Sequence, residues 1–117
     1  MTSTKGILVA MLAVSLMVSQ VQADVSLTAQ DWLDECEASD GTKYCVTYLS
    51  GVHDTLLTLE AMHVIHQLYC PGHIRISELR IVAMDYIRLH PEHASQMIPI
   101  VFIKAWAEKW PCVGGLE

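Results

Sequence analysis

Apolar residues recur at intervals of three and four along most of the chain beyond residue 28, and the alternation typical of strands is almost absent. This helical spacing is interrupted at residues 39–41, at residues 70–72 and at Pro91. The segments between the breaks predict four helices, over about residues 28–37, 42–66, 77–89 and 95–110. Because the connections are short, the pattern favours an all-α fold, a small up-down antiparallel bundle.

Polar residues stand where the predicted helices begin. Thr28 is followed three residues later by Asp31, an acidic variant of the capping box. Ser77 and Ser95 occupy corresponding places before the third and fourth helices. With Ser95 as the cap, Pro99 is tolerated, because the first N–H groups of a helix have no partner within the helix.

The third and fourth predicted helices carry apolar residues on both faces. In the third helix the inward stripe is Leu79, Val82, Ala83 and Tyr86, and the outward set is Ile81, Met84 and Arg88. In the fourth helix the two sets are Ile98, Val101, Phe102 and Ala105, and Ile100, Ile103 and Ala107. A helix that is apolar on both sides is buried on both sides, so the pattern predicts a partner protein or a homodimer. A packed monomer with scattered exposed apolar residues is the alternative.

Residues 1–23 have the pattern of a cleaved signal peptide. Lys5 gives a weakly positive start, residues 7–18 form an apolar stretch of 12 residues, and Val21 and Ala23 suit a signal-peptidase site. A membrane span needs about 20 residues, so an uncleaved anchor is the less favoured alternative. Export to the periplasm is expected, leaving residues 24–117 as one domain with no membrane attachment.

Charge and cysteine content narrow the class of the exported domain. The chain has 7 basic and 13 acidic residues, and removing Lys5 gives 6 − 13 = −7 with histidines neutral. This sign argues against nucleic acid and anionic lipid as partners and permits a basic protein. All four cysteines remain, and an even number in a short exported chain predicts two disulfides.

The bundle topology selects one of the three possible disulfide pairings. Cys36 and Cys45 flank the first connection, at one end of the bundle. Cys70 and Cys112 follow the second and fourth helices, which both finish at the opposite end. The topology therefore predicts Cys36–Cys45 and Cys70–Cys112.

Histidines are the main candidates for chemistry. The pairs His63/His66 and His90/His93 each have a spacing of three, but Pro91 breaks the second pair's helix and no acidic residue completes either pair at an obvious spacing. We therefore expect surface histidines and no metal or other cofactor, with a histidine-based metal carrier as a minor alternative. No strained serine turn or free cysteine is expected, so the sequence does not indicate an enzyme.

Several landmarks occur in an order that resembles a known family. They are Tyr48-Leu49-x-Gly51-Val52-x-Asp54, Cys70-Pro71, Tyr86-Ile87-x-x-His90-Pro91-Glu92 and Trp110-Pro111-Cys112. In this order they resemble the Rap/Tai immunity proteins of bacterial type VI secretion systems, over about residues 32–112. The resemblance implies a small helical periplasmic homodimer that binds a peptidoglycan amidase injected by sister cells and occludes its Cys–His active site. His63 and His66 have no place in the family pattern.

The main alternative function is that of an HdeA-like periplasmic acid-stress chaperone or another small periplasmic binding protein. Six histidines would gain protons below a pH of about 6.5 and reduce the negative charge from −7 to about −1.

Two surfaces are predicted to bind partners. The outward flank of the third helix, formed by Ile81, Met84 and Arg88, is assigned to self-association, because Met and Arg are enriched at interfaces. The adjoining turn, with His90, Glu92 and His93, is assigned to the toxin, because a turn at the end of a bundle can project into a cleft.

Overall fold

The computed structural model describes residues 27–38 and 42–113. Within these ranges the chain forms four α-helices and one short 3₁₀ helix, with no strand beyond a single isolated bridge. The elements are α2 (Ala29–Glu37), α3 (Thr42–Ala61), α4 (Ile76–Leu89), η1 (Pro91–His93) and α5 (Ile98–Lys109). The predicted all-α fold of four helices is confirmed. The predicted signal peptide and the break at residues 39–41 lie outside the described residues.

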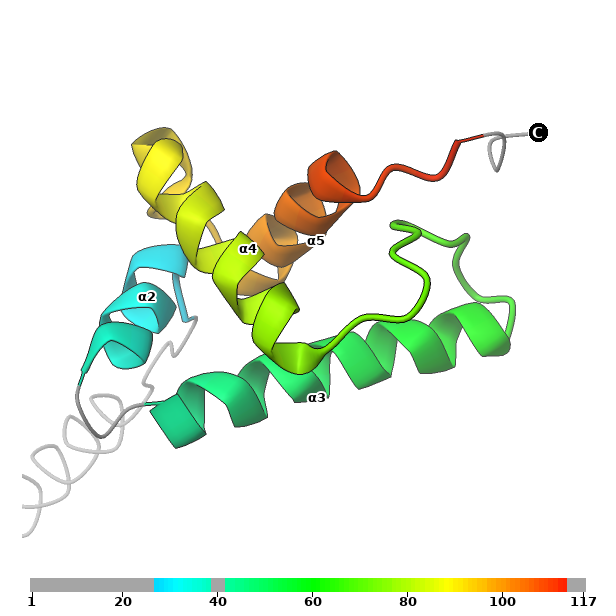
Figure 1. Ribbon diagram of the computed structural model, residues 1–117, viewed down its shortest axis with the longest axis horizontal. Helices are drawn as coiled ribbons and strands as arrows, with labels where there is room; N and C mark the ends of the chain where they lie inside the picture. The colour runs from blue at the N-terminus through cyan, green and yellow to red at the C-terminus, as the bar shows by residue number, and fades with distance from the viewer. Residues whose placement is uncertain (1–26, 39–41, 114–117) are drawn as a thin grey trace, which may run out of the picture.

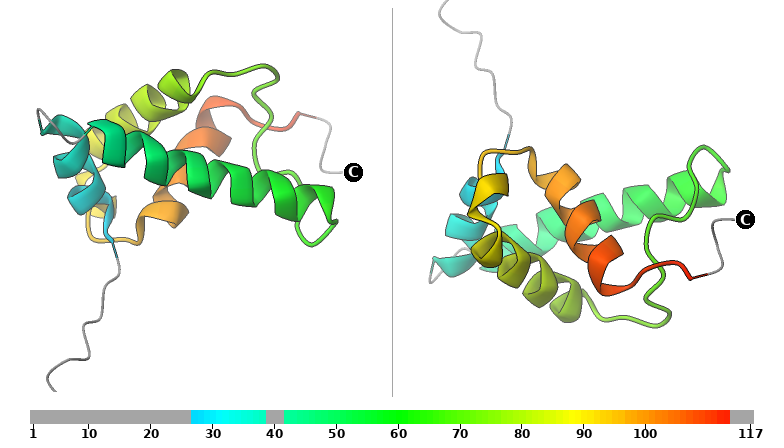
Figure 2. Two further views of the ribbon diagram at one scale, coloured as in Figure 1. Left: turned by 90° about the horizontal axis from the view of Figure 1, so that it is seen from below. Right: turned by 90° about the horizontal axis from the view of Figure 1, so that it is seen from above.

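The helices are arranged around α3, the longest of them (Figure 1). In Figure 2, α3 is nearest the viewer from below, whereas α4 and α5 are nearest from above, so α3 covers one side of the paired α4 and α5. The short helix α2 packs against the start of α3 and also contacts α4 and α5. The segment over residues 62–75 returns along the second half of α3, where Tyr69 contacts His53.

The start of α2 follows the sequence prediction. Thr28 is the N-cap, its side chain accepts a hydrogen bond from the backbone N–H of Asp31 at 3.1 Å, and the Asp31 carboxylate accepts one from the Thr28 N–H at 3.1 Å. Backbone hydrogen bonds from Ala29 to Gln96 and from Ile98 to Leu27 attach this cap to the start of α5. These backbone hydrogen bonds therefore hold the start of α2 against the start of α5.

The end of α3 differs from the prediction. The helix ends at Ala61 rather than near His66, because His63 adopts a left-handed conformation with φ 59°. The N–H of Val64 donates to the Leu59 carbonyl and the N–H of His63 donates to the Glu60 carbonyl, at 2.9 and 3.0 Å. This is the hydrogen-bond pattern of a Schellman motif, which usually has glycine at the left-handed position.

Two predicted caps are also wrong. The N-cap of α4 is Arg75, without a side-chain hydrogen bond, and Ser77 lies inside the first turn. The N-cap of α5 is Met97 rather than Ser95, which places Pro99 at the second helical position, where a missing N–H costs nothing. Residues 91–93, predicted only as a break, form the 3₁₀ helix η1.

Aromatic side chains form the centre of the core. The rings of Trp32 and Phe102 meet edge to face at 4.8 Å, and those of Phe102 and Trp106 stack at 4.9 Å. Both indole N–H groups are satisfied, since Trp32 donates to the Cys45 carbonyl at 3.2 Å and Trp106 donates to the Leu79 carbonyl at 3.0 Å. Each tryptophan therefore joins two helices by packing and by a hydrogen bond.

The predicted inward stripes are largely confirmed. All four predicted residues of α5 are buried, namely Ile98, Val101, Phe102 and Ala105. In α4 the buried residues are Leu79, Ala83 and Ile87, while Val82 and Tyr86 are only half-buried against the core. The inward face of α4 is thus rotated slightly from the predicted stripe.

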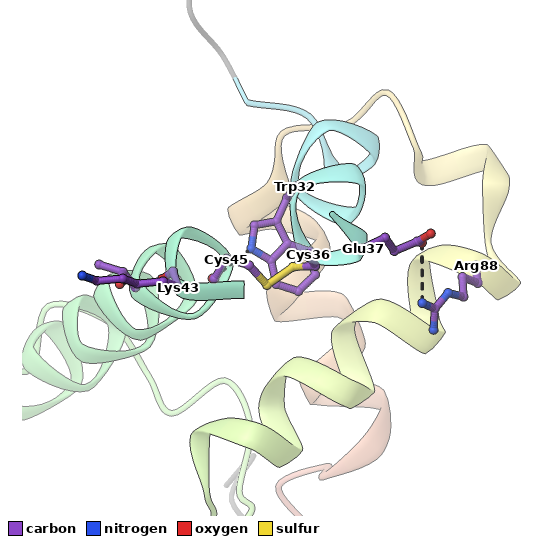
Figure 3. Close-up of a disulfide and its surroundings, with 7 residues drawn as sticks. Trp32, Cys36, Glu37, Lys43, Cys45 and Arg88 are labelled. Carbon is purple, nitrogen blue, oxygen red and sulfur yellow. Dashed lines mark hydrogen bonds and ion pairs between the residues drawn. A yellow bond between two sulfur atoms is a disulfide. The ribbon is translucent and has the colours of Figure 1, made fainter. Parts of the chain in front are cut away.

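Both predicted disulfides are present. Cys36 and Cys45, whose Cα atoms are 5.1 Å apart, join the end of α2 to the start of α3 beside Trp32 (Figure 3). Cys70 and Cys112, with Cα atoms 5.0 Å apart, attach the chain after α5 to the segment that returns along α3. By the chain-entropy relation, closing this second loop stabilises the fold by at most about 4 kcal/mol.

Candidate functional site

The outward flank of α4 contains one freely exposed apolar anchor. Ile81 is 52% exposed, as expected. Met84 is half-buried against the core, so its predicted position on the outer face is wrong. Arg88 is exposed but its guanidinium lies 3.5 Å from the Glu37 carboxylate and 3.3 Å from that of Asp85, which links α4 to α2 (Figure 3). The structure therefore separates the three predicted flank residues into different environments.

The turn after α4 brings its three predicted residues together. The Nδ1 of His90 lies 3.0 Å from the Glu92 carboxylate, and the Nε2 of His93 lies 3.9 Å from the same oxygen. The side chains of His90 and His93 are 33% and 22% exposed, and that of Glu92 is 60% exposed. The cluster is thus open to solvent on its carboxylate side.

Glu92 completes the second histidine pair, contrary to the expectation that no acidic residue completes either pair. The 3₁₀ helix begins at Pro91 and turns the chain more tightly than an α-helix. Glu92, between the two histidines in sequence, can therefore reach both rings. The spacing of the three residues was evident in the sequence. The convergence of their side chains, however, depends on the 3₁₀ helix η1, which was not predicted.

The ring of Tyr86 packs against both histidine rings of this cluster. Its ring centroid lies 4.2 Å from that of His90 and 5.9 Å from that of His93, and its plane is within 7° of the His93 plane. Burial raises the pKa of the Tyr86 hydroxyl, and the carboxylates of Glu108 and Glu92 raise it further. Tyr86 thus remains neutral, stacks on the His93 ring and packs against the tilted His90 ring.

Local hydrogen bonds hold Glu92 in its charged form. Its own backbone N–H lowers the pKa of the carboxyl group, and His90 lowers it further by hydrogen bonding. The Nδ1 of His93 is buried and has no hydrogen-bond partner. The cluster therefore presents a carboxylate beside two imidazole rings.

The other predicted histidine pair does not form such a cluster. His63 and His66 lie after the end of α3 and are exposed. Within residues 27–38 and 42–113, the group of His90, Glu92 and His93 is the one set of three side chains with donor atoms close enough to share an ion.

His53 and Tyr69 form a buried polar pair that was not predicted from the sequence. The Nδ1 of His53, on α3, lies 2.6 Å from the Tyr69 hydroxyl, and both side chains pack against Trp106. Burial lowers the pKa of His53, against the opposing effect of Asp54 and Glu60. Burial also raises the pKa of Tyr69. The signal available in the sequence was the position of His53, four residues after Leu49 on the inward face.

An apolar groove of about 490 Å³ lies between α3 and the start of α5. Its lining residues are Thr47, Tyr48, Gly51, Val52, Thr55, Leu56 and Pro99. No other segment of the described chain packs closely against Gly51 in this groove, because a Cβ atom added there would meet nothing within 4 Å.

Comparison with known protein families identifies a relationship for this chain. The model of the family described as Rap1a immunity proteins matches residues 28–112, which include all four described helices and both disulfides. No curated protein and no solved structure matches the chain. None of the helices in the described part of the chain is long and apolar enough to span a membrane.

Proposed function

Because the chain belongs to the Rap1a immunity protein family, we propose that it is a periplasmic immunity protein that neutralises a type VI secreted peptidoglycan amidase. Membership of the family implies a protein that binds and inhibits a partner effector. The match over residues 28–112 is the observation that carries the proposal. The identity of the effector as an amidase is our inference from the ordered motifs.

Export of the protein is part of the proposal. Disulfides form and persist in oxidising compartments such as the bacterial periplasm, and this chain has two, with no free cysteine in the described residues. Residues 1–23 would supply the signal peptide. A peptidoglycan amidase acts in the same compartment, so toxin and inhibitor would meet there.

Inhibition by occlusion requires an exposed surface and no chemistry of its own. We assign the turn with His90, Glu92 and His93 to the effector, because it projects from the end of α4 and combines a carboxylate with two hydrogen-bonding rings. The exposed Ile81 lies on the flank of the same helix. We assign this flank to a homodimer, since an exposed isoleucine can supply an apolar anchor at an interface.

A protection assay tests the proposal. Cells that export a candidate amidase effector should lyse, and co-expression of the full chain should prevent lysis. A version lacking residues 1–23 should accumulate but give no protection. Tight, specific binding between the purified proteins should accompany protection. Full protection by the cytoplasmic version, or no binding to the amidase, would contradict the proposed function.

A further inference from the structure

The turn after α4 places three metal-ligating side chains within reach of one another. One donor atom from each of His90, Glu92 and His93 lies within 4.8 Å of the other two. Two of these separations are 3.0 and 3.9 Å, both to the Glu92 carboxylate. Nitrogen and oxygen donors bind Zn²⁺ at about 2.0–2.2 Å, which places neighbouring donors roughly 3.3–3.6 Å apart in a tetrahedron. Small side-chain rotations would bring the observed separations to these values.

Backbone hydrogen bonds and a proline already order the main chain of the cluster, so the binding of a metal ion would not have to order it. Pro91 fixes one φ angle, and the N–H of His93 donates to the His90 carbonyl at 2.9 Å. The N–H of Ala94 donates to the Pro91 carbonyl at 3.1 Å. All three ligands come from one four-residue segment, so little conformational entropy remains to be lost on binding.

The ligand set indicates which ion would bind. Two imidazole nitrogens and one carboxylate suit Zn²⁺, whereas Ca²⁺ and Mg²⁺ prefer oxygen ligands only. The exposed carboxylate side would leave the fourth position to water, as in zinc sites with three protein ligands. No cation competes closely for Glu92 among the described contacts, because Arg88 pairs with Glu37 and Asp85.

We propose that His90, Glu92 and His93 form a surface site for Zn²⁺ with a fourth position open to water. The zinc site does not depend on the proposed immunity function, and zinc binding can be measured on the protein alone, without the effector. Its ligands nevertheless lie in the turn assigned to the effector, so the two properties must be tested separately.

Calorimetric titration tests the site. The untagged protein, with both disulfides formed, is stripped with EDTA, exchanged into metal-free buffer at neutral pH and titrated with ZnCl₂. We expect one Zn²⁺ per chain and no comparable binding of Ca²⁺ or Mg²⁺. Glu92→Gln and His93→Ala should each weaken zinc binding by at least about tenfold, since even an outer-shell partner of a metal ligand commonly contributes that much.

The variant His63→Ala/His66→Ala is the matched control. It removes two exposed histidines with the same spacing but leaves the cluster intact, so its zinc affinity should equal that of the natural chain. Circular dichroism would verify that each variant is folded, and the conservative Glu92→Gln change keeps the side-chain shape. Absence of zinc binding would overturn the site. So would affinity unchanged by Glu92→Gln and His93→Ala, or affinity lost equally in the control.

Discussion

His53 has a protonation equilibrium set by its position in the core rather than by its residue type. Its Nδ1 lies 2.6 Å from the Tyr69 hydroxyl and its ring packs nearly perpendicular to the Trp106 ring, where a charged imidazolium would be poorly solvated. The folded state therefore favours the neutral ring, and the pKa of His53 lies below its ordinary value. The unfolded chain, in contrast, binds a proton near pH 6.5.

This difference predicts how stability depends on pH. At pH values between the folded and unfolded pKa values of His53, the unfolded state binds more protons than the folded state. The free energy of unfolding therefore rises with pH in this range, and His53 lowers it as the pH falls below about 6.5. In His53→Gln the Tyr69 hydroxyl keeps a hydrogen-bonding partner but the titration is gone. We expect the melting temperature of the natural chain to fall more steeply between pH 7.5 and 5 than that of the variant.

Thermal unfolding at five or six pH values would measure both slopes. The exposed His66 provides the control, since His66→Gln should leave the slope unchanged. Equal slopes for the natural chain and His53→Gln would show that burial does not suppress protonation of this residue.

At the scale of elements, the helix ends decide how much of the fold follows from the sequence. The start of α2 was predictable because Thr28 and Asp31 carry their own capping hydrogen bonds within three residues. The end of α3 was not predictable, because the left-handed position that ends a helix is usually occupied by glycine, whereas here it is occupied by His63. The Cys70–Cys112 pairing was predictable from topology, which depends on helix order rather than on exact helix ends.

The same distinction explains what was missed in the candidate site. The positions of His90, Glu92 and His93 were evident, but their convergence requires the 3₁₀ turn after Pro91 and the supporting ring of Tyr86. Met84 was placed outside by an idealised 100° periodicity, whereas the contacts of α4 with its neighbours rotate its inner face toward this residue. Local patterns therefore identified the residues, and tertiary contacts determined their geometry.

The end of α3 yields a second prediction. His63→Gly should raise the free energy of unfolding by about 0.5–1 kcal/mol, because glycine adopts φ 59° without the steric cost that a Cβ atom imposes. The gain is limited by the greater flexibility of glycine in the unfolded chain. Urea denaturation would measure the difference.

The neighbouring His66→Gly change serves as the comparison. His66 is exposed and does not have a positive φ, so glycine there should bring no stabilisation. If both changes affect stability alike, conformational strain at His63 is not the cause.

At the scale of the whole molecule, the third prediction concerns self-association. Ile81 lies on the outer side of α4, opposite the core, and is more than half exposed in the single chain. If this flank forms a homodimer, Ile81→Asp would bury a carboxylate without a partner at a cost of several kcal/mol. Sedimentation equilibrium should show a dimer for the natural chain and a monomer for the variant.

Met62 offers a matched control, because it is another exposed apolar residue carried by a different part of the chain. Met62→Asp should leave the dimer intact. A dimer that survives Ile81→Asp, or one that Met62→Asp also dissociates, would place the interface elsewhere.

The last prediction concerns the effector surface. The turn carries the Glu92 carboxylate and the partly exposed His90 ring, whose hydrogen bonds are formed mainly with each other. In a complex with the effector, both groups could exchange this contact for bonds to the partner. Replacing them together in His90→Ala/Glu92→Ala should therefore weaken effector binding by about 1–3 kcal/mol, the range for losing hydrogen bonds to charged groups.

Binding should be measured by calorimetry in the presence of EDTA, so that zinc at the same side chains has no influence on the result. His73→Ala/Glu78→Ala removes the same two residue types from exposed positions on another surface and should leave the affinity unchanged. Because the altered side chains of the turn lie outside the buried core, both variants should keep the thermal stability of the natural chain. A turn variant that is folded, zinc-free and still binds the effector with full affinity would show that the inhibitory contact is made by a different surface, of which the groove along α3 is the next to test.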